Sequence, residues 1–139
     1  MTTATTEALQ NGLFINGEFV DARSGVAGAV EAYLGQHFLS RHARYRLLTR
    51  NTSLRDSSGW DLDQVNPHKL HVAAEAGDEG AREVLAWAGH KLGAALGSAI
   101  NLLDIRKVVI GGGVAAAGEF ILGPARRTVL RYVMPGLRG

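Results

Sequence analysis

The sequence predicts an α/β fold in which helices dominate and a short hairpin lies near the N-terminus. Apolar residues recur at helical spacing over residues 79–103, as on a helix with one buried face. Two apolar triplets flank Asn16-Gly17, a pair that accepts the positive φ angles of a type I′ hairpin turn. Residues 107–110, Lys-Val-Val-Ile, form a β-branched run that predicts a strand buried on both faces, as in a parallel sheet.

The composition is that of one globular domain with a modest core. The chain has 139 residues, of which 46% are apolar and 20% charged, and its formal net charge is +2. This nearly balanced charge argues against a dedicated nucleic-acid-binding protein. Because the chain has no cysteine, disulfides, thiolate zinc sites and a cysteine nucleophile are excluded.

The sequence carries no membrane or export signal. The first ten residues lack the basic and apolar regions of a signal peptide. The longest apolar window, residues 92–103, is shorter than the ~20 residues of a membrane-spanning helix. We therefore expect a cytoplasmic protein that does not associate with membranes.

Three segments follow one another along the chain. Residues 1–11 are rich in Thr and Ala and are expected to form a disordered tail. Residues 12–25 are the hairpin and its connector, and residues 26–139 are the main lobe. Within this lobe we expect a helix over residues 26–50 and a loop over residues 51–63.

Four arginines lie close together in the first expected helix: Arg41, Arg44, Arg46 and Arg50. Runs of charge on a helix are usually a solvated face. We prefer that interpretation to a phosphate-binding patch.

The ends of the next two helices carry clear signals. Asn66-Pro67 has the pattern of an N-cap followed by proline at the first helical position. Gly77 is a suitable residue for the turn that ends this helix. Asp78 can then cap the long helix that continues to about residue 103.

The two C-terminal helices contain residues that are unfavourable in helix interiors. The long helix carries Gly89, Gly93 and Gly97 on one face, each costing up to ~1 kcal/mol relative to alanine. Such a row predicts a smooth groove that another backbone approaches closely inside the core. The last helix, at about residues 119–133, contains Pro124, where it could restart.

Three consecutive glycines, Gly111, Gly112 and Gly113, follow the expected strand and precede a helix. A bare backbone at this position can approach a phosphate or a nucleoside. The stretch is neither a Walker loop nor a G-x-G-x-x-G fingerprint, and no acidic residue stands about 20 positions later to hold a ribose. The glycines alone therefore favour a tight turn over a binding site.

The order of these elements is more specific than the glycine count. The stretches "AGDEGAREVLAWAGHKLGAALGSAINLLDIRKVVIGGGV" and "VEAYLGQHFLS", residues 76–114 and 30–40, resemble the C-terminal part of the ROK family. This family contains glucokinase-like sugar kinases and repressors, and the resemblance covers about residues 26–135. It implies a partial actin-like ATPase fold of ROK type, namely the C-terminal lobe.

The resemblance also implies ligands and residue roles. Gly111, Gly112 and Gly113 would lie against the adenosine and phosphates of ATP, which the family uses with Mg. Glu31 matches the glutamate that hydrogen-bonds sugar hydroxyls in the family, so a hexose would be the substrate. The plain alternative for Glu31 is an exposed glutamate favoured by the helix dipole.

Several parts of the family's kinase are missing from this sequence. The first phosphate loop and the catalytic aspartate belong to an N-terminal lobe that precedes the matched region, so we assign no catalytic residue. The family's zinc module of one histidine and three cysteines is absent as well. The histidine pairs His37 with His42 and His68 with His71 are expected to be surface residues, and we expect no metal site.

The hairpin segment has two candidate origins. Residues 12–25, which include "LFINGEFVDARSG", also resemble the N-terminal hairpin of aldehyde dehydrogenases. They resemble more loosely the strand-turn-strand that precedes the zinc module in the ROK family. Both origins stay open.

Three functions follow from these observations. The first is a truncated ROK-type sugar kinase lobe that keeps part of the ATP and sugar sites and is not catalytically competent alone. The second is a sugar-responsive regulatory or oligomerisation module of the same family, which would be a homo-oligomer. The third is a non-functional gene fusion. No helix-turn-helix precedes the lobe, so we expect no direct DNA binding.

Overall fold

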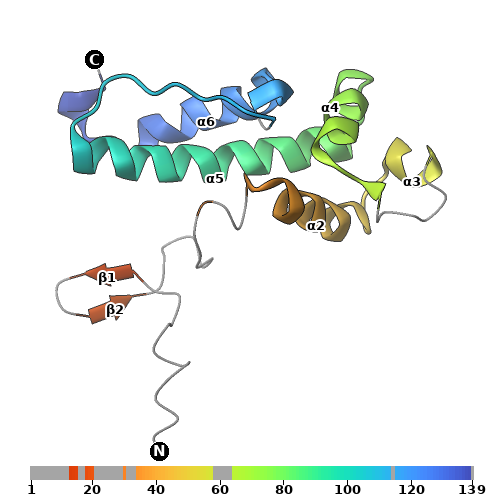
Figure 1. The fold of residues 1–139 in the computed structure, drawn as a ribbon, viewed down its shortest axis with the longest axis horizontal. Coiled ribbons are helices and arrows are strands. Elements are labelled where there is room, and N and C mark those ends of the chain that lie inside the picture. Colours follow the sequence, from red (N-terminus) through yellow and green to blue (C-terminus); the bar gives the residue numbers. More distant parts are fainter. Residues whose placement is uncertain are drawn as a thin grey trace, which may run out of the picture.

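The computed structural model describes residues 13–15, 18–20, 30, 34–57, 64–113 and 115–138. Helices make up most of this part of the chain (Figure 1). The strands and helices are β1 (Leu13–Ile15), β2 (Glu18–Val20), α2 (Gln36–Leu47), α3 (Ser53–Ser57), α4 (Pro67–Glu75), α5 (Glu79–Leu103) and α6 (Glu119–Tyr132). Short 3-10 turns cover Ala115–Ala117 and Pro135–Leu137.

The two expected hairpin strands pair antiparallel, with Phe14 opposite Phe19. These two strands form the one sheet in the part of the chain that the structure describes. The Asn16-Gly17 turn between them lies outside the described residues, so the turn type stays a prediction.

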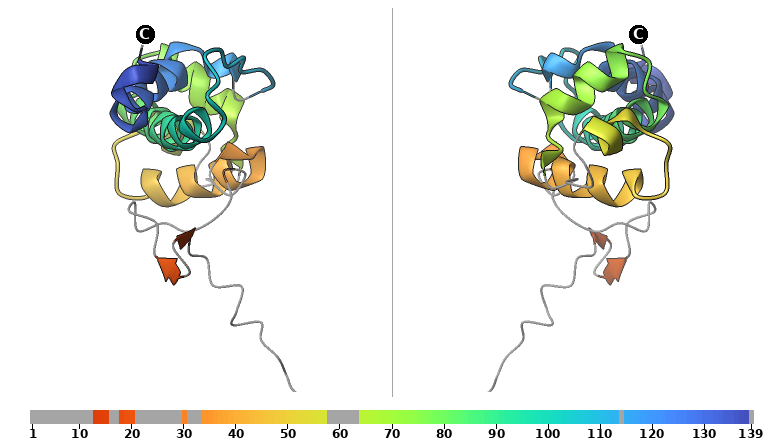
Figure 2. Two further views of the ribbon diagram at one scale, coloured as in Figure 1. Left: turned by 90° about the vertical axis from the view of Figure 1, so that its left-hand side faces the viewer. Right: turned by 90° about the vertical axis from the view of Figure 1, so that its right-hand side faces the viewer.

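Helices α5 and α6 lie side by side and run in the same direction (Figure 1). After the end of α5, an extended segment that includes residues 105–110 runs back alongside α5 and α6, and the chain then enters α6 (Figure 1). Helices α2 and α4 pack against α5 near its N-terminal half, and α2 lies on the opposite side of α5 from α6 (Figure 2). The long α5 is therefore the element that every other major helix contacts.

The core forms where these helices meet. Its largest fully buried side chains come from four helices and the segment before α4. They are Leu39, Leu47, Val65, Leu70, Val84, Leu85 and Ile121. Burying a side chain of this size stabilises the fold by roughly 1.5–3 kcal/mol.

The glycine row on α5 is a packing surface for α6, as the sequence predicts. Gly89, Gly93 and Gly97 are all buried. A Cβ on Gly93 would lie 2.5 Å from the carbonyl oxygen of Ala125, and one on Gly97 would lie 2.5 Å from the Cβ of Tyr132. Only glycine leaves room for this close approach.

The predicted N-caps are present. The Asn66 side chain accepts a hydrogen bond from the Lys69 N–H at 2.9 Å, and Asp78 accepts one from the Ala81 N–H at 2.8 Å. Gly77 adopts a φ of +98°, the left-handed conformation expected at a helix end. These local signals explain why the α4 and α5 boundaries follow from the sequence.

Pro124 lies inside a continuous α6, so the alternative of a helix restart at this residue is wrong. The proline is buried, and a Cβ on Gly89 would lie 3.0 Å from its Cβ. The missing side chain of Gly89 makes room for the proline against α5. Helix packing therefore outweighs the local cost of proline.

The strand predicted at residues 107–110 is wrong. Residues 105–110 have no regular secondary structure, and Val109 is 84% exposed. A parallel strand exists only with a hydrogen-bonded neighbour. Within the described residues, this segment makes no backbone–backbone hydrogen bond, so the part of the fold class that depends on a buried sheet strand is not observed.

Two smaller expectations also need correction. The expected loop over residues 51–63 contains α3, whose first turn is capped by Thr52 through a 3.2 Å hydrogen bond from the Leu54 N–H. Of the helix expected over residues 26–50, the structure describes residue 30 and residues 34–50, and the regular part is Gln36–Leu47. Gly35 is the N-cap of that regular part, with non-helical backbone angles (φ −58°, ψ 141°), so the regular helix begins only after it.

Candidate functional site

The glycine turn borders the larger of the two cavities described for this chain. Its volume is about 600 Å³, within the range typical of small-molecule sites. The cavity lies where the turn after the extended segment meets the N-terminal ends of α2 and α4. Its lining residues are Leu34, Gly35, Gln36, Asn66, Pro67, His68, His71, Gly111, Gly112, Gly113, Ala116 and Ala117.

The three positions differ in how strictly their backbone conformation requires glycine. Gly112 has a φ of +82°, so its backbone conformation favours glycine. Gly111 and Gly113 have ordinary φ values, and a Cβ on either would meet no atom within 4 Å. Among the residues that the structure describes, neither the turn nor the packing therefore explains these two glycines. They leave an open backbone on the cavity wall, which a flat or anionic ligand can approach.

Two helix N-termini add a positive field to the same cavity. Gly35 precedes α2 without a side-chain cap, and Pro67 stands at the first position of α4. The N-terminus of a helix carries about half a positive elementary charge. The wall thus combines a bare backbone with a field that favours an anion.

His71 is the titratable residue set deepest in this wall. Its Nε2 lies 3.5 Å from a carboxylate oxygen of Glu75, and its ring meets Phe120 edge to face at 6.0 Å. Its buried Nδ1 has no hydrogen-bond partner within the described residues. The position of His71 is set by the first helical turns of α4, which Asn66 caps.

The described lining combines apolar surface and bare backbone with two histidines and two amide side chains. No carboxylate belongs to it, so we place no Mg ligand in this cavity. Throughout the part of the chain that the structure describes, no three His, Asp or Glu side chains gather as metal ligands. None of the helices in that part of the chain combines the length and the apolar character of a membrane-spanning segment.

The sequence singled out four binding residues, and the structure describes three of them. Gly111, Gly112 and Gly113 lie together on the cavity wall. Glu31 lies outside the described residues, so its sugar contact stays a prediction. The contributions of Gly35 and Asn66 were missed, because only tertiary packing brings them to the turn.

Comparison with known proteins finds sequence similarity to glucokinases. It is 29% identical over 115 residues to a glucokinase of Thermotoga maritima. This match covers 83% of the chain and 36% of the relative. A solved ROK family glucokinase of Streptomyces griseus, in complex with glucose and AMPPNP, is 28% identical with a TM-score of 0.68. That match covers 83% of this chain and 36% of the other.

The fold also resembles a regulator of the same family. A ROK family transcriptional regulator, described as a homologue of the E. coli MLC protein, has a TM-score of 0.69 at 20% identity. The match covers 91% of this chain and 31% of the regulator. This chain therefore spans about a third of the length of each of these relatives. The profile of the ROK family matches residues 11–139, nearly the whole sequence, and the chain belongs to the ROK family.

Proposed function

We propose that this chain is the nucleotide- and sugar-binding part of a ROK-type, glucokinase-like sugar kinase. The observation that carries the proposal is the cavity beside Gly111 and Gly113, whose open backbone has no other explanation in the described structure. Its volume of about 600 Å³ suits the adenosine part of ATP. The likeness to a glucokinase solved with an ATP analogue supports the same assignment.

Each wall of the cavity would have its own task. The backbone at Gly111–Gly113 would lie against the nucleotide, and the N-termini of α2 and α4 would favour its phosphates. Glu31, which precedes α2 in sequence, would accept hydrogen bonds from sugar hydroxyls. The hairpin segment 12–25 would be a separate unit beside the lobe formed by residues 26–139.

Phosphoryl transfer requires more than these residues supply. A base must accept the proton of the sugar hydroxyl, and metal ligands must hold the phosphates of Mg·ATP in line with it. We assign no residue of this chain to either task. The chain alone is therefore expected to bind nucleotide and sugar without forming a sugar phosphate.

Calorimetric titration with Mg·ATP, with and without glucose, tests the proposal. We expect saturable binding of ATP that glucose strengthens. Gly111→Val adds a side chain where, apart from the chain neighbours, no described atom lies within 4 Å of the new Cβ. It should therefore weaken ATP binding at least tenfold without unfolding the chain. The matched control is Gly136→Val, because Gly136 also has open space around it and does not line the cavity.

Two results would overturn this function. One is a folded wild-type chain that binds no ATP. The other is an equal affinity for ATP in the wild type and in Gly111→Val. For the sugar, Glu31→Gln should weaken glucose binding and leave ATP binding unchanged.

The second candidate is a sugar-responsive regulatory module that acts as a homo-oligomer. The likeness to a ROK family regulator favours it through fold alone. Sedimentation, which measures the oligomeric state, and the calorimetric titration together separate the two candidates. A dimer that binds glucose and no ATP supports the regulatory module.

A further inference from the structure

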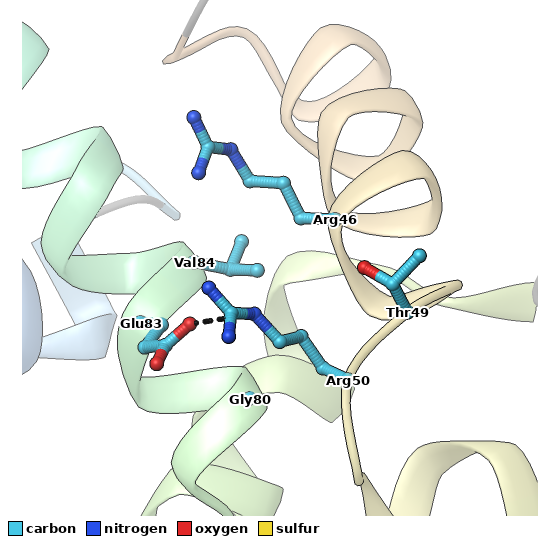
Figure 3. A pocket seen from close by; sticks show the side chains of 6 residues that line it. All are labelled: Arg46, Thr49, Arg50, Gly80, Glu83 and Val84. Carbon is cyan, nitrogen blue, oxygen red and sulfur yellow. Dashed lines mark ion pairs between the residues drawn. The ribbon is translucent and has the colours of Figure 1, made fainter.

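A second cavity lies between the end of α2 and the first turns of α5. Its volume is about 180 Å³, and it shares no lining residue with the cavity at the glycine turn. Figure 3 shows two arginine side chains extending toward α5 across it, Arg46 from α2 and Arg50 from the segment that follows α2. The lining residues are Arg46, Thr49, Arg50, Gly80, Glu83 and Val84.

The lining carries an excess of positive charge. Arg50 is paired with Glu83, whose carboxylate lies 3.1 Å from the Arg50 Nε (Figure 3). Glu83 is the one acidic residue among the described lining residues. The charge of Arg46 therefore has no carboxylate of its own in the cavity wall.

Further basic groups gather next to this wall, around the ring of Trp87. The guanidinium of Arg46 lies 4.5 Å from the ring centroid, and the Lys91 ammonium lies 5.9 Å from it. The His42 ring packs against the same indole at 4.8 Å. Burial, and after it the charge of Arg46, lower the pKa of Lys91. The charges of Arg46 and Lys91 repel one another, and a bound anion would relieve that repulsion.

The start of α5 borders the same cavity and carries its own acidic residues. Gly80 belongs to the first turn of this 25-residue helix, where the helix dipole is positive. Asp78, the nearby N-cap, does not line the cavity, and its oxygens accept hydrogen bonds from Thr52, Ser53 and Ala81. Asp78, with a carboxylate oxygen 3.3 Å from where a Cβ on Gly80 would stand, and Glu79 compensate this dipole, so the positive charge of the cavity comes from its arginines.

We propose that this α2–α5 cavity binds a phosphate group, either inorganic phosphate or the phosphate of a small sugar phosphate. Arg46 would donate two hydrogen bonds from its planar guanidinium, the geometry that suits phosphate oxygens. Thr49 would donate through its hydroxyl, and Arg50 would share its charge between Glu83 and the ligand. The cavity is smaller than the 300–1,000 Å³ typical of larger ligands, which excludes a whole nucleotide.

The site stands apart from the proposed kinase function, because it uses other residues. It gives Arg46 and Arg50, two of the four neighbouring arginines, a role beyond that of a solvated face. The other two, Arg41 and Arg44, do not line the cavity.

The test uses Trp87 as the reporter. The chain has two tryptophans, so Trp60→Phe leaves Trp87 as the only one. Inorganic phosphate is titrated at constant ionic strength, with chloride as the balancing anion, and Trp87 fluorescence is recorded. We expect a saturable change, and we expect phosphate to raise the melting temperature of the unmodified chain.

Three variants distinguish a site from general screening. Arg46→Gln keeps a helix-forming side chain of similar length and should weaken phosphate binding at least about tenfold. Glu83→Gln removes the competing carboxylate and should tighten binding several-fold. The matched control is Arg126→Gln, because Arg126 is an exposed cation paired with Glu119 on α6, and it should bind as the wild type does.

The opposite signs expected for the Arg46 and Glu83 variants are what a merely structural role would not produce. No saturable response, or equal affinities in Arg46→Gln and Arg126→Gln, would overturn the proposal. Tighter binding of glucose 6-phosphate than of phosphate would identify a sugar phosphate as the ligand. Equal binding of the two would identify the phosphate group alone as what the site recognises.

Discussion

At the scale of single residues, Asp78 joins two helices that are distant in sequence. One carboxylate oxygen caps α5, and the other accepts hydrogen bonds from the Thr52 hydroxyl at 2.8 Å and the Ser53 N–H at 2.6 Å. Burial raises the pKa of Asp78, but the hydrogen bonds together outweigh it and hold the pKa below its ordinary value of 3.8. The carboxylate form is therefore the one that fits the fold.

Replacing this carboxylate should cost stability. We expect Asp78→Ala to lower the free energy of unfolding by about 2 kcal/mol, because both the cap and the tie to α3 are lost. Urea denaturation measures the change. The control is Glu79→Gln at the next position, which should change stability by less than about 0.5 kcal/mol. Equal effects of the two variants would contradict the role given to Asp78.

The same residue predicts a pH dependence. Because the pKa is lowered on folding, the carboxylate contributes its full stabilisation above pH 3.8 and loses it as the pH falls through the lower folded value. We expect the free energy of unfolding of the wild type to fall more steeply over that acidic range than that of Asp78→Asn. Parallel pH profiles of the two proteins would contradict this.

Gly112 and Gly111 make a second contrast between single residues. The φ of +82° at Gly112 makes any L-residue strained, so Gly112→Ala should destabilise the chain by about 1 kcal/mol. Gly111→Ala should be neutral or slightly stabilising, because its Cβ meets nothing within 4 Å. Thermal unfolding of both variants checks this. A cost at Gly111 equal to that at Gly112 would mean that the turn itself demands both glycines.

At the scale of elements, the α5–α6 contact depends on the absence of side chains. A Cβ on Gly93 would lie 2.5 Å from the Ala125 carbonyl oxygen and 2.6 Å from the Thr128 Cβ. Thr128 also hydrogen-bonds the His90 ring at 2.7 Å, so the same turn of α6 is held by a polar contact. The helices cannot separate locally without breaking that bond.

Gly93→Ala should therefore destabilise the chain by about 3 kcal/mol, although alanine is the better helix former by up to ~1 kcal/mol. The matched control is Gly123→Ala in α6. There the nearest atom to a new Cβ is a carboxylate oxygen of Glu119 at 3.3 Å, at the end of a flexible side chain. The control should be neutral or stabilising by up to ~1 kcal/mol. Stabilisation by Gly93→Ala in urea denaturation would contradict the packing described here.

The elements that the sequence predicts well are those with local signals. Asn66, Gly77 and Asp78 mark helix ends through bonds and angles within a few residues, so α4 and α5 were expected at nearly their observed bounds. The prediction of a strand at residues 107–110 was wrong because strand pairing depends on partners distant in sequence. The short α3 was missed for the same reason, since Asp78 stabilises its start from 25 residues away.

In the candidate site, too, the residues with a local sequence signal could be predicted, and those brought in by helix packing could not. Gly111, Gly112 and Gly113 were visible as an unusual local run, and the family resemblance suggested their ligand. The starts of α2 and α4 reach the turn only through helix packing, so no local pattern could reveal Gly35 or Asn66 as neighbours.

At the scale of the whole molecule, apolar side chains near the end of α5 and in the segment after it are exposed to solvent. Leu102 is 83% exposed and Val109 is 84% exposed. Val109 belongs to an extended segment whose backbone makes no hydrogen bond to another described backbone group. Such segments pair readily with other chains.

We therefore expect Val109→Thr to reduce concentration-dependent association while leaving the free energy of unfolding within about 0.5 kcal/mol of the wild type. Sedimentation velocity over a range of protein concentrations measures the first, and urea denaturation measures the second. A loss of more than about 1 kcal/mol would mean that Val109 is buried in solution.

The central claim is that the open glycine turn is a nucleotide contact. The most direct measurement is an amide NMR titration of the isotope-labelled chain with Mg·AMPPNP. The account predicts saturable shifts at the amides of Gly111, Gly112, Gly113 and Gly35, with little change along the exposed face of α6. Unchanged glycine amides, in a chain that remains folded, would show that the three glycines only turn the backbone.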